Sequence, residues 1–364
     1  MKILIIINNL TTGGAEKLIL ETIPLLKKKG IKVDLLVLDG KDYPYMKQLR
    51  ELNCCNIYSL GNGSLLNPMY VFKIIPYLKK YDLVHVHLFP AQYLVVFAKI
   101  FSISKVKIVF TEHSTSNRRI QNNLFKYIER FVYSFYTKII CITDEVKQVF
   151  EAHTKLKGNR FVVITNGVNL KGIDSALALD RNKIYDSTIN ENDKIIIQIA
   201  GFRIEKDQKT VIRVMQYLET NVKLLLVGDG SLRKECEQLV KELDLHERVF
   251  FLGVRTDVPS LLKTADISVV SSNWEGFGLA AVEGMASKKP LIASNVAGLS
   301  NVVKGAGILF EKGDDKELSK IIQELLADGD YYNKVAESGF ERAKQYDING
   351  MVDKQIRLYR ELVK

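Results

Sequence analysis

Short apolar runs rich in β-branched residues alternate with amphipathic helical stretches along this chain, and the alternation occurs in two successive sets. The apolar runs of the first set are at residues 3–7, 33–38, 83–86, 107–110, 138–142 and 161–164, and those of the second at 194–200, 223–227, 249–252, 267–270 and 291–293. Strands that alternate with helices predict parallel sheets covered by helices on both faces. Two sets in 364 residues also fit two domains of ~150 residues each. We therefore expect an α/β protein with two Rossmann-like, doubly wound parallel-sheet domains.

The apolar periodicity fades after Asn166-Gly167, which predicts a linker over residues 166–193. We accordingly expect an N-terminal domain at residues 1–168 and a C-terminal domain at residues 190–345. The last stretch, residues 346–364, has apolar residues at helical spacing and predicts a terminal helix.

The composition is that of an ordinary soluble globular enzyme, with 47% hydrophobic and 26% charged residues. The longest apolar stretch, residues 93–103, is interrupted by Lys99 and is shorter than the ~20 residues that span a bilayer. The run at residues 3–7 is too short for the apolar core of a signal peptide. The four cysteines lack CxxC spacing, which is typical of free thiols in a reducing cytosol. These features predict a cytoplasmic protein without a transmembrane segment.

Positive charge is concentrated in the N-terminal half. Residues 1–170 contain 24 Lys and Arg against 12 Asp and Glu, whereas residues 171–364 contain 28 against 30. This asymmetry suits an anionic partner, and we recognise no nucleic-acid-binding motif, so an acidic membrane surface is favoured over nucleic acid. The stretch 118–138 begins with Arg118 and Arg119 and alternates basic with aromatic residues. Such a pattern suits either a membrane interface or a core helix with a solvated basic face, and both interpretations stay open.

Two glutamates, Glu275 and Glu283, flank a turn that opens into a predicted helix, with seven residues between them. The turn consists of Gly276, Phe277, Gly278 and Leu279. The first N–H groups of a helix are unpaired and its dipole adds about half a positive charge, so a phosphate can bind there. Glu283 falls on the second helical turn, where its carboxylate can accept hydrogen bonds from a sugar diol. The segment therefore predicts a nucleotide-sugar site, although Asn273 or Glu275 acting only as a helix cap is the plainer alternative.

A second glycine turn begins at Gly201, directly after the apolar run at residues 194–200. Open α/β sheets bind their ligands at such strand ends. Arg203 and Lys206 are three residues apart in this turn, so both can face one anion. An arginine fork and a compact lysine charge together can hold a diphosphate. The alternative is a solvated pair of cations near a helix start.

The histidines differ in what their positions predict. His85 and His87 occupy alternate positions at the end of a predicted strand, so they share one face, as two metal ligands would. No third ligand with suitable spacing is evident, so we expect no metal site. His113 lies just past another predicted strand, at the edge where a site would open. His153 and His246 stand among charged residues, and we expect both to be solvated.

Several short motifs follow one another in order over nearly the whole chain. They are Gly13-Gly14-Ala15-Glu16, Asp82-Leu-Val-His85-Val-His87, Thr111-Glu-His113, Asn166-Gly-Val-Asn169, the Arg203/Lys206 turn, Leu226-Val-Gly-Asp-Gly230, Phe251-Leu-Gly-Val-Arg-Thr-Asp257 and the paired-glutamate segment. In this order the motifs resemble those of glycosyltransferase family 4, a large group of retaining enzymes with the GT-B architecture. A series of motifs in a fixed order is far more specific than any one of them.

This resemblance implies two Rossmann-like domains that face each other across a cleft, with residues 346–364 crossing back onto the N-terminal domain. It implies a donor site for a nucleotide-diphosphate sugar, formed by Gly14, Gly201, Arg203, Lys206, Gly228, Gly253, Val254, Gly276, Phe277, Gly278, Leu279 and Glu283. It places Gly13, His85 and His87 on the acceptor side.

The resemblance also implies the catalytic roles. His113 would contact the donor sugar near the reacting carbon, and Glu275 would position that sugar. Arg203 and Lys206 would neutralise the leaving diphosphate, without a metal ion or other cofactor. In the front-face transfer usually inferred for this group, the leaving phosphate oxygen accepts the proton of the acceptor, so no carboxylate pair at glycosidase spacing is required.

For the substrates, the resemblance favours a UDP-sugar over a GDP-sugar, on family frequency alone. It implies a saccharide acceptor carried on a lipid, as in the assembly of capsule or lipopolysaccharide, and hence a peripheral enzyme on the inner face of the cell membrane. Two alternatives remain. A sugar-nucleotide epimerase of the same architecture would need acid and base residues that we do not identify. A catalytically silent glycosyltransferase subunit would have lost the diphosphate clamp, which this chain retains.

Two details bear on these alternatives. Gly13-Gly14 lacks the further glycine of a dinucleotide fingerprint, so NAD binding is not predicted. Family members commonly carry a glycine pair followed by a glutamate, whereas here Ala297 replaces the first glycine and Asn301 takes the place of the glutamate. How this loop approaches the donor is therefore left open.

Overall fold

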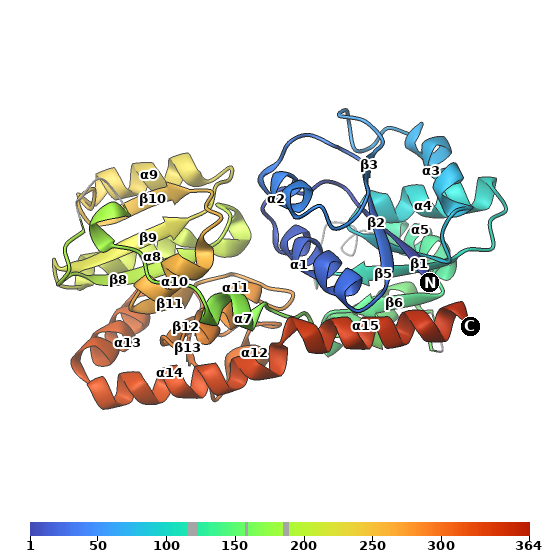
Figure 1. The fold of residues 1–364 in the computed structure, drawn as a ribbon. Helices are drawn as coiled ribbons and strands as arrows, with labels where there is room; N and C mark the ends of the chain where they lie inside the picture. Colours follow the sequence, from blue (N-terminus) through green and yellow to red (C-terminus); the bar gives the residue numbers. More distant parts are fainter. Residues whose placement is uncertain (115–122, 157–158, 185–188) are drawn as a thin grey trace. The chain divides into compact units, whose positions relative to one another are not determined.

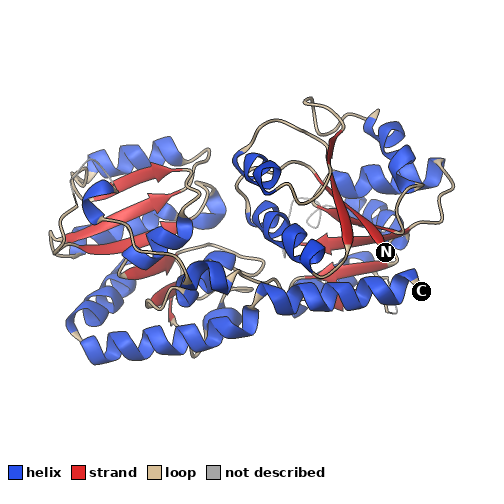
Figure 2. Cartoon of the chain, in the orientation of Figure 1, coloured by secondary structure: helices blue, strands red, loops and turns tan. Residues whose placement is uncertain are grey.

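A computed structural model describes residues 1–114, 123–156, 159–184 and 189–364 of the chain. Within these residues the chain forms two compact units, one of residues 1–167 together with 348–364, and one of residues 168–347. Each unit contains a parallel sheet with helices packed against it (Figure 2).

The first unit is built on a seven-stranded sheet in the order β3-β2-β1-β4-β5-β6-β7. Its strands are β1 (Lys2–Ile7), β2 (Lys32–Val37), β3 (Ile57–Ser59), β4 (Leu83–His87), β5 (Lys107–Glu112), β6 (Lys138–Cys141) and β7 (Phe161–Val163). All neighbouring strands pair in parallel. The order reverses between β1 and β4, and with right-handed crossovers this places the connecting helices on both faces of the sheet.

Two groups of helices follow from this topology. One group contains α1 (Gly14–Lys28), α2 (Pro44–Leu52) and α15 (Ile348–Val363), in which α1 contacts both of the others. The other group is α3 (Tyr70–Leu78), α4 (Ala91–Phe101), α5 (Asn123–Ser134) and α6 (Asp144–Thr154), each in contact with the next. Alternate residues of β1, namely Ile3, Ile5 and Ile7, pack with apolar residues of the first group. The helices therefore cover a sheet that is buried on both faces, as a parallel sheet requires.

The last helix returns to the first unit, as the family resemblance implied (Figure 1). Met351, Val352 and Ile356 of α15 are buried in the same core cluster as β1. An ion pair between Lys29 Nζ and Asp353 Oδ1, at 2.7 Å, joins the end of α1 to α15.

The second unit repeats the arrangement with six strands in the order β10-β9-β8-β11-β12-β13. Its strands are β8 (Lys194–Ile199), β9 (Val222–Val227), β10 (Val249–Gly253), β11 (Ile267–Val270), β12 (Leu291–Ser294) and β13 (Ile308–Phe310). Its helices are α7 (Leu170–Asp174), α8 (Gln208–Val214), α9 (Arg233–Glu242), α10 (Val258–Thr264), α11 (Leu279–Ala286), α12 (Ser300–Val303), α13 (Asp315–Ala327) and α14 (Gly329–Ala343), with 3-10 turns η1 (Arg181–Lys183), η2 (Ile204–Lys206), η3 (Met215–Tyr217) and η4 (Lys344–Tyr346).

Both faces of this sheet are buried as well. Ile196 of β8 packs in a cluster with residues of α8, α9 and α13, whereas Ile195 and Ile197 pack in another with residues of α10. Successive side chains of a strand point to opposite faces, so β8 contributes to both layers of the core. The order reverses between β8 and β11, and the loops at the carboxyl ends of these two strands are therefore where a ligand site is expected.

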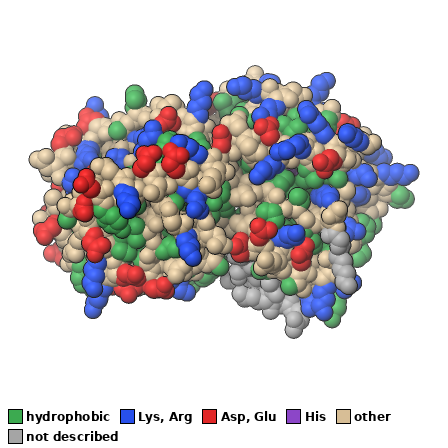
Figure 3. Space-filling view, turned by 90° about the horizontal axis from the view of Figure 1, so that it is seen from below, with side chains coloured by type: hydrophobic (Ala, Val, Ile, Leu, Met, Phe, Trp, Pro, Cys, Tyr) green, Lys and Arg blue, Asp and Glu red, His purple; other side chains and the backbone are tan. Residues whose placement is uncertain are grey.

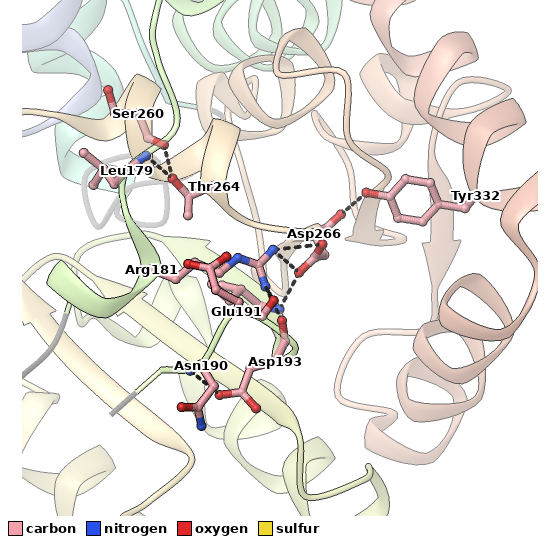
Figure 4. Close-up of polar contacts among 10 residues, drawn as sticks. Leu179, Arg181, Asn190, Glu191, Asp193, Ser260, Thr264, Asp266 and Tyr332 are labelled. Atoms are coloured by element: carbon pink, nitrogen blue, oxygen red, sulfur yellow. Dashed lines mark hydrogen bonds and ion pairs between the residues drawn. The ribbon is translucent and has the colours of Figure 1, made fainter. Parts of the chain in front are cut away.

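The segment that the sequence predicts as a linker packs on the second unit instead. Helix α7 contacts α10 and α11, and Leu179 N donates to Thr264 Oγ1 at 2.8 Å. Arg181 pairs with Asp266 at 3.2 Å and donates to backbone carbonyls at Glu191 and Asp193 (Figure 4). Ile184 and Ile189 are also buried in the apolar cluster that contains Ile195 and Ile197. Two isolated apolar residues and a few polar contacts leave no apolar periodicity in the sequence.

No helix within the described ranges is long and apolar enough to cross a bilayer.

Candidate functional site

Three glycine loops meet at the carboxyl ends of the strands in the second unit. Phe202 N donates to Asp229 O at 3.0 Å, and Gly228 N donates to Gly253 O at 2.8 Å. Gly228 has φ +136°, and a Cβ atom there would lie 2.2 Å from Ala200 O. Only glycine allows the loops after β8 and β9 to approach so closely. The predicted donor residues Gly201, Gly228 and Gly253 thus belong to one connected edge, next to the half-exposed side chain of Val254.

Buried polar side chains hold the Arg203/Lys206 turn in place. Gln198 Nε2 donates to the backbone oxygen of Lys206 and to Ser271 Oγ, both at 2.9 Å, and Ser271 Oγ donates to Asp207 O at 2.8 Å. Asn273 N donates to Glu205 O at 2.8 Å. The sequence analysis did not single out Gln198 or Ser271. A glutamine inside the apolar run of a predicted buried strand was the available signal, since buried polar groups need partners.

The structure brings Lys206 and Glu275 together. Lys206 Nζ forms an ion pair with Glu275 Oε1, which also accepts a hydrogen bond from Ser272 Oγ at 2.9 Å. Arg203, by contrast, is exposed, and within the described ranges its side chain has no hydrogen bond or ion pair. The two predicted clamp residues therefore differ: Arg203 is open to solvent, and Lys206 is already paired with a carboxylate.

Helix α11 begins directly after the predicted turn. Gly278 is its N-cap, in the left-handed conformation at φ +86°, and no side chain caps the helix. Its first N–H groups are therefore available to an anion, with the helix dipole adding positive potential. The Phe277 ring is buried and packs edge-on against Tyr346, with ring centroids 5.3 Å apart. Phe277 can therefore serve a ligand only through its backbone, as Gly276, Gly278 and Leu279 would.

Glu283 lies on the second turn of α11, as predicted, and only 5% of it is exposed. An ionised carboxylate is seldom so buried unless it is hydrogen-bonded. Its position is therefore not that of a solvated surface acid.

The loop that departs from the family pattern touches the backbone of Glu275. Gly298 has φ +79°, and a Cβ atom there would lie 2.3 Å from Glu275 O. Ala297 and Asn301 are exposed. The retained glycine is thus the one that the close contact requires, and the two departures fall at exposed positions.

In the first unit, the loop after β1 is tied to the loop after β4. Asn8 is buried, and its Nδ2 donates to Phe89 O at 2.6 Å. Gly13 is the N-cap of α1, which begins at Gly14, and a Cβ atom at Gly13 would lie 2.3 Å from a carboxylate oxygen of Glu16. Both predicted glycines therefore lie at the carboxyl edge of the sheet, at the start of α1.

His85 does not fit the acceptor-side role that the resemblance implies. Its Nδ1 lies 2.6 Å from Tyr359 Oη and its Nε2 lies 2.6 Å from Thr111 Oγ1, and only 1% of the residue is exposed. Burial and the nearby His113 lower the pKa of His85 to about 3. With both ring nitrogens bonded inside the unit, His85 is a structural link between β4, β5 and α15.

His87 and His113 contact each other at the carboxyl ends of β4 and β5. His87 Nδ1 lies 3.0 Å from His113 Nε2. His87 is buried, whereas His113 is partly exposed. Burial lowers the pKa of His113 to about 4, and burial together with the neighbouring histidines holds the pKa of His87 well below its usual value. Both rings are therefore neutral near pH 7.

Two further sequence expectations can be compared with the structure. His153 is not solvated: it is buried and pairs with the buried Glu129, Nε2 to Oε2, at 2.7 Å. His246 is exposed, as expected. Over the described part of the chain, no group of three or more His, Cys, Asp or Glu side chains is arranged to hold a metal ion.

Comparisons with known proteins agree with this architecture. The sequence model of the family described as "Glycosyltransferase Family 4" matches residues 12–171, and that of "Glycosyl transferases group 1" matches residues 180–342. The UDP-Gal:alpha-D-GlcNAc-diphosphoundecaprenol alpha-1,3-galactosyltransferase of Escherichia coli is 26% identical over 303 residues, which is 78% of this chain and 76% of the relative. The N-acetylgalactosamine-N,N'-diacetylbacillosaminyl-diphospho-undecaprenol 4-alpha-N-acetylgalactosaminyltransferase of Campylobacter jejuni is 25% identical, over 95% of this chain and 96% of the relative.

Among solved structures, Anabaena HepE in complex with UDP and glucose has a TM-score of 0.85 to this chain and 21% identity, over 99% of each chain. This likeness shows the same fold. The two family models together cover both units, and the sheet orders are those of two doubly wound domains. The chain therefore belongs to glycosyltransferase family 4 and has the GT-B fold.

Proposed function

We propose that this protein is a retaining glycosyltransferase that moves a sugar from a UDP-sugar to a lipid-linked saccharide acceptor in surface-polysaccharide biosynthesis. One observation carries the proposal. The loop that contains Glu275, the ion-pair partner of Lys206, leads directly into the N-terminus of α11, which no side chain caps. A helix N-terminus, a lysine and an exposed arginine are the groups that hold a diphosphate without a metal ion.

In the proposed reaction, the diphosphate of the donor binds the first N–H groups of α11 together with Arg203 and Lys206. These groups stabilise the negative charge that grows on the leaving phosphate as the sugar bond breaks. The leaving phosphate oxygen accepts the proton of the acceptor hydroxyl, so the side chains need not supply a base. Neither a metal ion nor another cofactor is required by this scheme.

The carboxylates have separate tasks in this proposal. Glu283 accepts hydrogen bonds from the ribose diol of the nucleotide. Glu275, released from Lys206 when the diphosphate arrives, orients the donor sugar, and His113 donates a hydrogen bond to the same sugar.

The names of the relatives support the choice of substrates. The Escherichia coli relative is named for UDP-Gal and a diphosphoundecaprenol-linked acceptor, and the Campylobacter jejuni relative for a diphospho-undecaprenol-linked acceptor. The structure of HepE contains UDP and glucose. A UDP-sugar and a lipid-linked glycan are therefore the best-supported pair for this chain.

Helix α5 supports a peripheral contact with an anionic bilayer on the inner face of the cell membrane. One face of α5 is core, with Val132 and Tyr133 buried, while Tyr127 is 72% and Phe131 is 50% exposed. Arg130 is exposed beside them. Aromatic and basic side chains together suit a lipid interface. Arg118 and Arg119, which the sequence analysis assigned to the same stretch, lie outside the described residues.

A panel of UDP- and GDP-sugars in thermal-shift and turnover assays tests the proposal. We expect UDP-sugars to raise the melting temperature, because a ligand at a hundred times its Kd stabilises the folded state by about 2.7 kcal/mol. Arg203→Ala should lose roughly tenfold or more in donor affinity, since a charge-assisted hydrogen bond contributes about 1.5–3 kcal/mol. Its melting temperature without ligand should not change, because Arg203 is exposed.

Arg213→Ala is the matched control, an exposed arginine on α8, the helix that follows the same turn. No stabilisation by any nucleotide sugar, or equal donor affinity in Arg203→Ala and wild type, would contradict the proposal. Binding of UDP-sugars without turnover on any lipid-linked acceptor would favour a catalytically silent subunit.

A further inference from the structure

The contact between His87 and His113 restricts where the ring protons can be. A neutral imidazole carries one N–H, and the two facing nitrogens, 3.0 Å apart, share one hydrogen. Either His87 Nδ1 donates to His113 Nε2, or the reverse. The other nitrogen of His87 decides between these two arrangements.

His87 Nε2 is buried and has no hydrogen-bond partner among the described residues. If the proton of His87 were on Nε2, it would be a buried donor without an acceptor. If the proton is on Nδ1, Nε2 is only an unfilled acceptor. Orphaned buried N–H groups are rarer in proteins than under-satisfied buried acceptors. The network therefore assigns the proton to His87 Nδ1, with His113 Nε2 accepting it.

This assignment fixes the outer nitrogen of His113. Since Nε2 accepts, the single proton of the neutral His113 ring is on Nδ1. No described residue bonds His113 Nδ1, and this atom is not among the buried unpartnered ones. It therefore presents an N–H donor, without positive charge, at the carboxyl edge of β5.

We propose that His87 is a positioning residue that holds His113 as the Nδ1–H tautomer, so that His113 donates a hydrogen bond to a hydroxyl of the donor sugar. The tautomer follows from contacts within the first unit, and the sugar contact rests on the function proposed above. A charged donor at this position would be attracted to any anion, whereas a neutral one is suited to a hydroxyl group. His87 thus acts on specificity through His113, without touching the sugar.

The tautomer is measured in the unliganded protein, where no assumption about function enters. Two-bond 1H–15N correlation spectra near pH 7 distinguish Nδ1–H from Nε2–H histidine. We expect the His113 signals, assigned by comparison with His113→Gln, to show Nδ1–H. Free histidine favours Nε2–H, and free histidine at the same pH supplies the reference spectrum. An Nε2–H signal for His113 would overturn the proposal, whatever the enzyme catalyses.

Two substitutions at His87 test its role. His87→Leu removes the donor, so His113 should revert to Nε2–H and kcat should fall roughly tenfold, the loss expected for one hydrogen bond, while the affinity for UDP stays unchanged. His87→Asn places an amide N–H near the position of Nδ1, so it should restore the Nδ1–H tautomer and most of kcat.

The outcomes separate the two claims. If His87→Leu keeps the Nδ1–H tautomer and wild-type kcat, His87 does not position His113. If His87→Leu fails to fold, the wild-type spectrum still decides the tautomer of His113, and a His87→Asn variant whose His113 is Nε2–H with wild-type kcat would overturn the positioning role. If the tautomer of His113 changes in His87→Leu but neither His87→Leu nor His113→Gln alters turnover, the positioning contact exists and the proposed sugar contact of His113 is wrong.

Discussion

At the scale of single residues, the pairing of Lys206 with Glu275 determines how charge is held in the unliganded second unit. The Glu275 side chain is 12% exposed and that of Lys206 is 29% exposed, so water screens this pair only in part. Removing one member of a poorly solvated pair leaves the other charge uncompensated. A diphosphate that binds Lys206 competes with Glu275 for it, and this competition gives the two glutamates different expected effects.

The substitutions Glu275→Gln and Glu283→Gln should separate nucleotide binding from turnover. Glu275→Gln should cut kcat roughly tenfold or more, because the proposed contact with the donor sugar is weakened. It should not weaken UDP binding, because the diphosphate no longer competes with a carboxylate for Lys206. Glu283→Gln should weaken UDP binding roughly tenfold, because an amide replaces the carboxylate proposed to hold the ribose diol. Calorimetry with UDP and initial-rate assays measure the two effects. The reverse pattern would mean that the two roles are exchanged.

At the scale of elements, α15 is attached to the sheet of the first unit through a buried histidine. Tyr359 of α15 and Thr111 of β5 bond the two ring nitrogens of His85 on β4. The residues of the His85–Tyr359 contact are 274 positions apart in the chain. Because His85 is buried and its pKa is lowered to about 3, this attachment depends on a neutral ring.

Stability should therefore fall as the pH is lowered. Below its unfolded pKa of about 6.5, His85 takes up a proton in the unfolded chain but not in the folded one, so acid favours unfolding between about pH 6.5 and the folded pKa. From about pH 7 to about pH 5 this residue should remove about 2 kcal/mol from the free energy of unfolding. His85→Gln keeps hydrogen-bonding groups but cannot titrate, so it should lack this loss. Urea unfolding of the wild type and His85→Gln, followed by circular dichroism at both pH values, measures this loss of stability. Equal pH dependence of the unfolding free energy in the two proteins would contradict the prediction.

At the scale of the whole molecule, the net positive charge is carried by the first unit. Residues 1–167 and 348–364 carry 28 Lys and Arg against 14 Asp and Glu, whereas residues 168–347 carry 24 against 28. In Figure 3, Lys and Arg side chains are frequent over the first unit and acidic side chains are commoner over the second. Lys27, Lys28, Lys79 and Lys80 follow or end helices that lead into strands, so they lie at the amino edge of the sheet. Helix α5 instead follows β5, whose carboxyl end lies at the opposite edge of the sheet, near His87 and His113.

Vesicle co-sedimentation should show which of these surfaces meets a membrane. We expect binding to anionic vesicles at low salt and little to neutral ones, with about 1 kcal/mol for each well-placed Lys or Arg. The double change Tyr127→Ser and Phe131→Ser should weaken binding roughly tenfold, because apolar area on α5 is lost. Leu177→Ser, at an 83% exposed apolar residue of the second unit, is the control and should have no effect.

Two other results would change this interpretation. A larger loss in the double change Lys79→Gln and Lys80→Gln than in the α5 variant would place the membrane contact at the amino edge of the sheet. Equal, negligible binding to anionic and neutral vesicles would leave the first unit with a solvated basic surface and favour a soluble acceptor.

Features that depend on a few neighbouring residues were predictable from the sequence alone. Apolar runs predicted the strands of both sheets except the three-residue edge strands β3 and β13, because burial on both faces of a parallel sheet demands nearly continuous apolar strands. An edge strand of three residues gives only a weak signal of this kind. The glycines before Leu279 determined where α11 begins, and helical geometry then placed Glu283 on its second turn. These signals are local, so no knowledge of tertiary packing was needed to read them.

Only the tertiary structure decided which polar side chains are partners. Lys206 and Glu275 are 69 residues apart, and His87 and His113 are 26 apart, and in both cases the sheet order brings the two loops together. The same holds for His153, expected in solvent but buried against Glu129, and for Arg181 of the predicted linker, which pairs with Asp266 of the second unit. A polar side chain carries no periodic signal of its burial, because its partner is set by the fold and not by its neighbours in the chain. The sequence by itself therefore determined the elements and the motifs, whereas the structure decided how their charges and protons are shared.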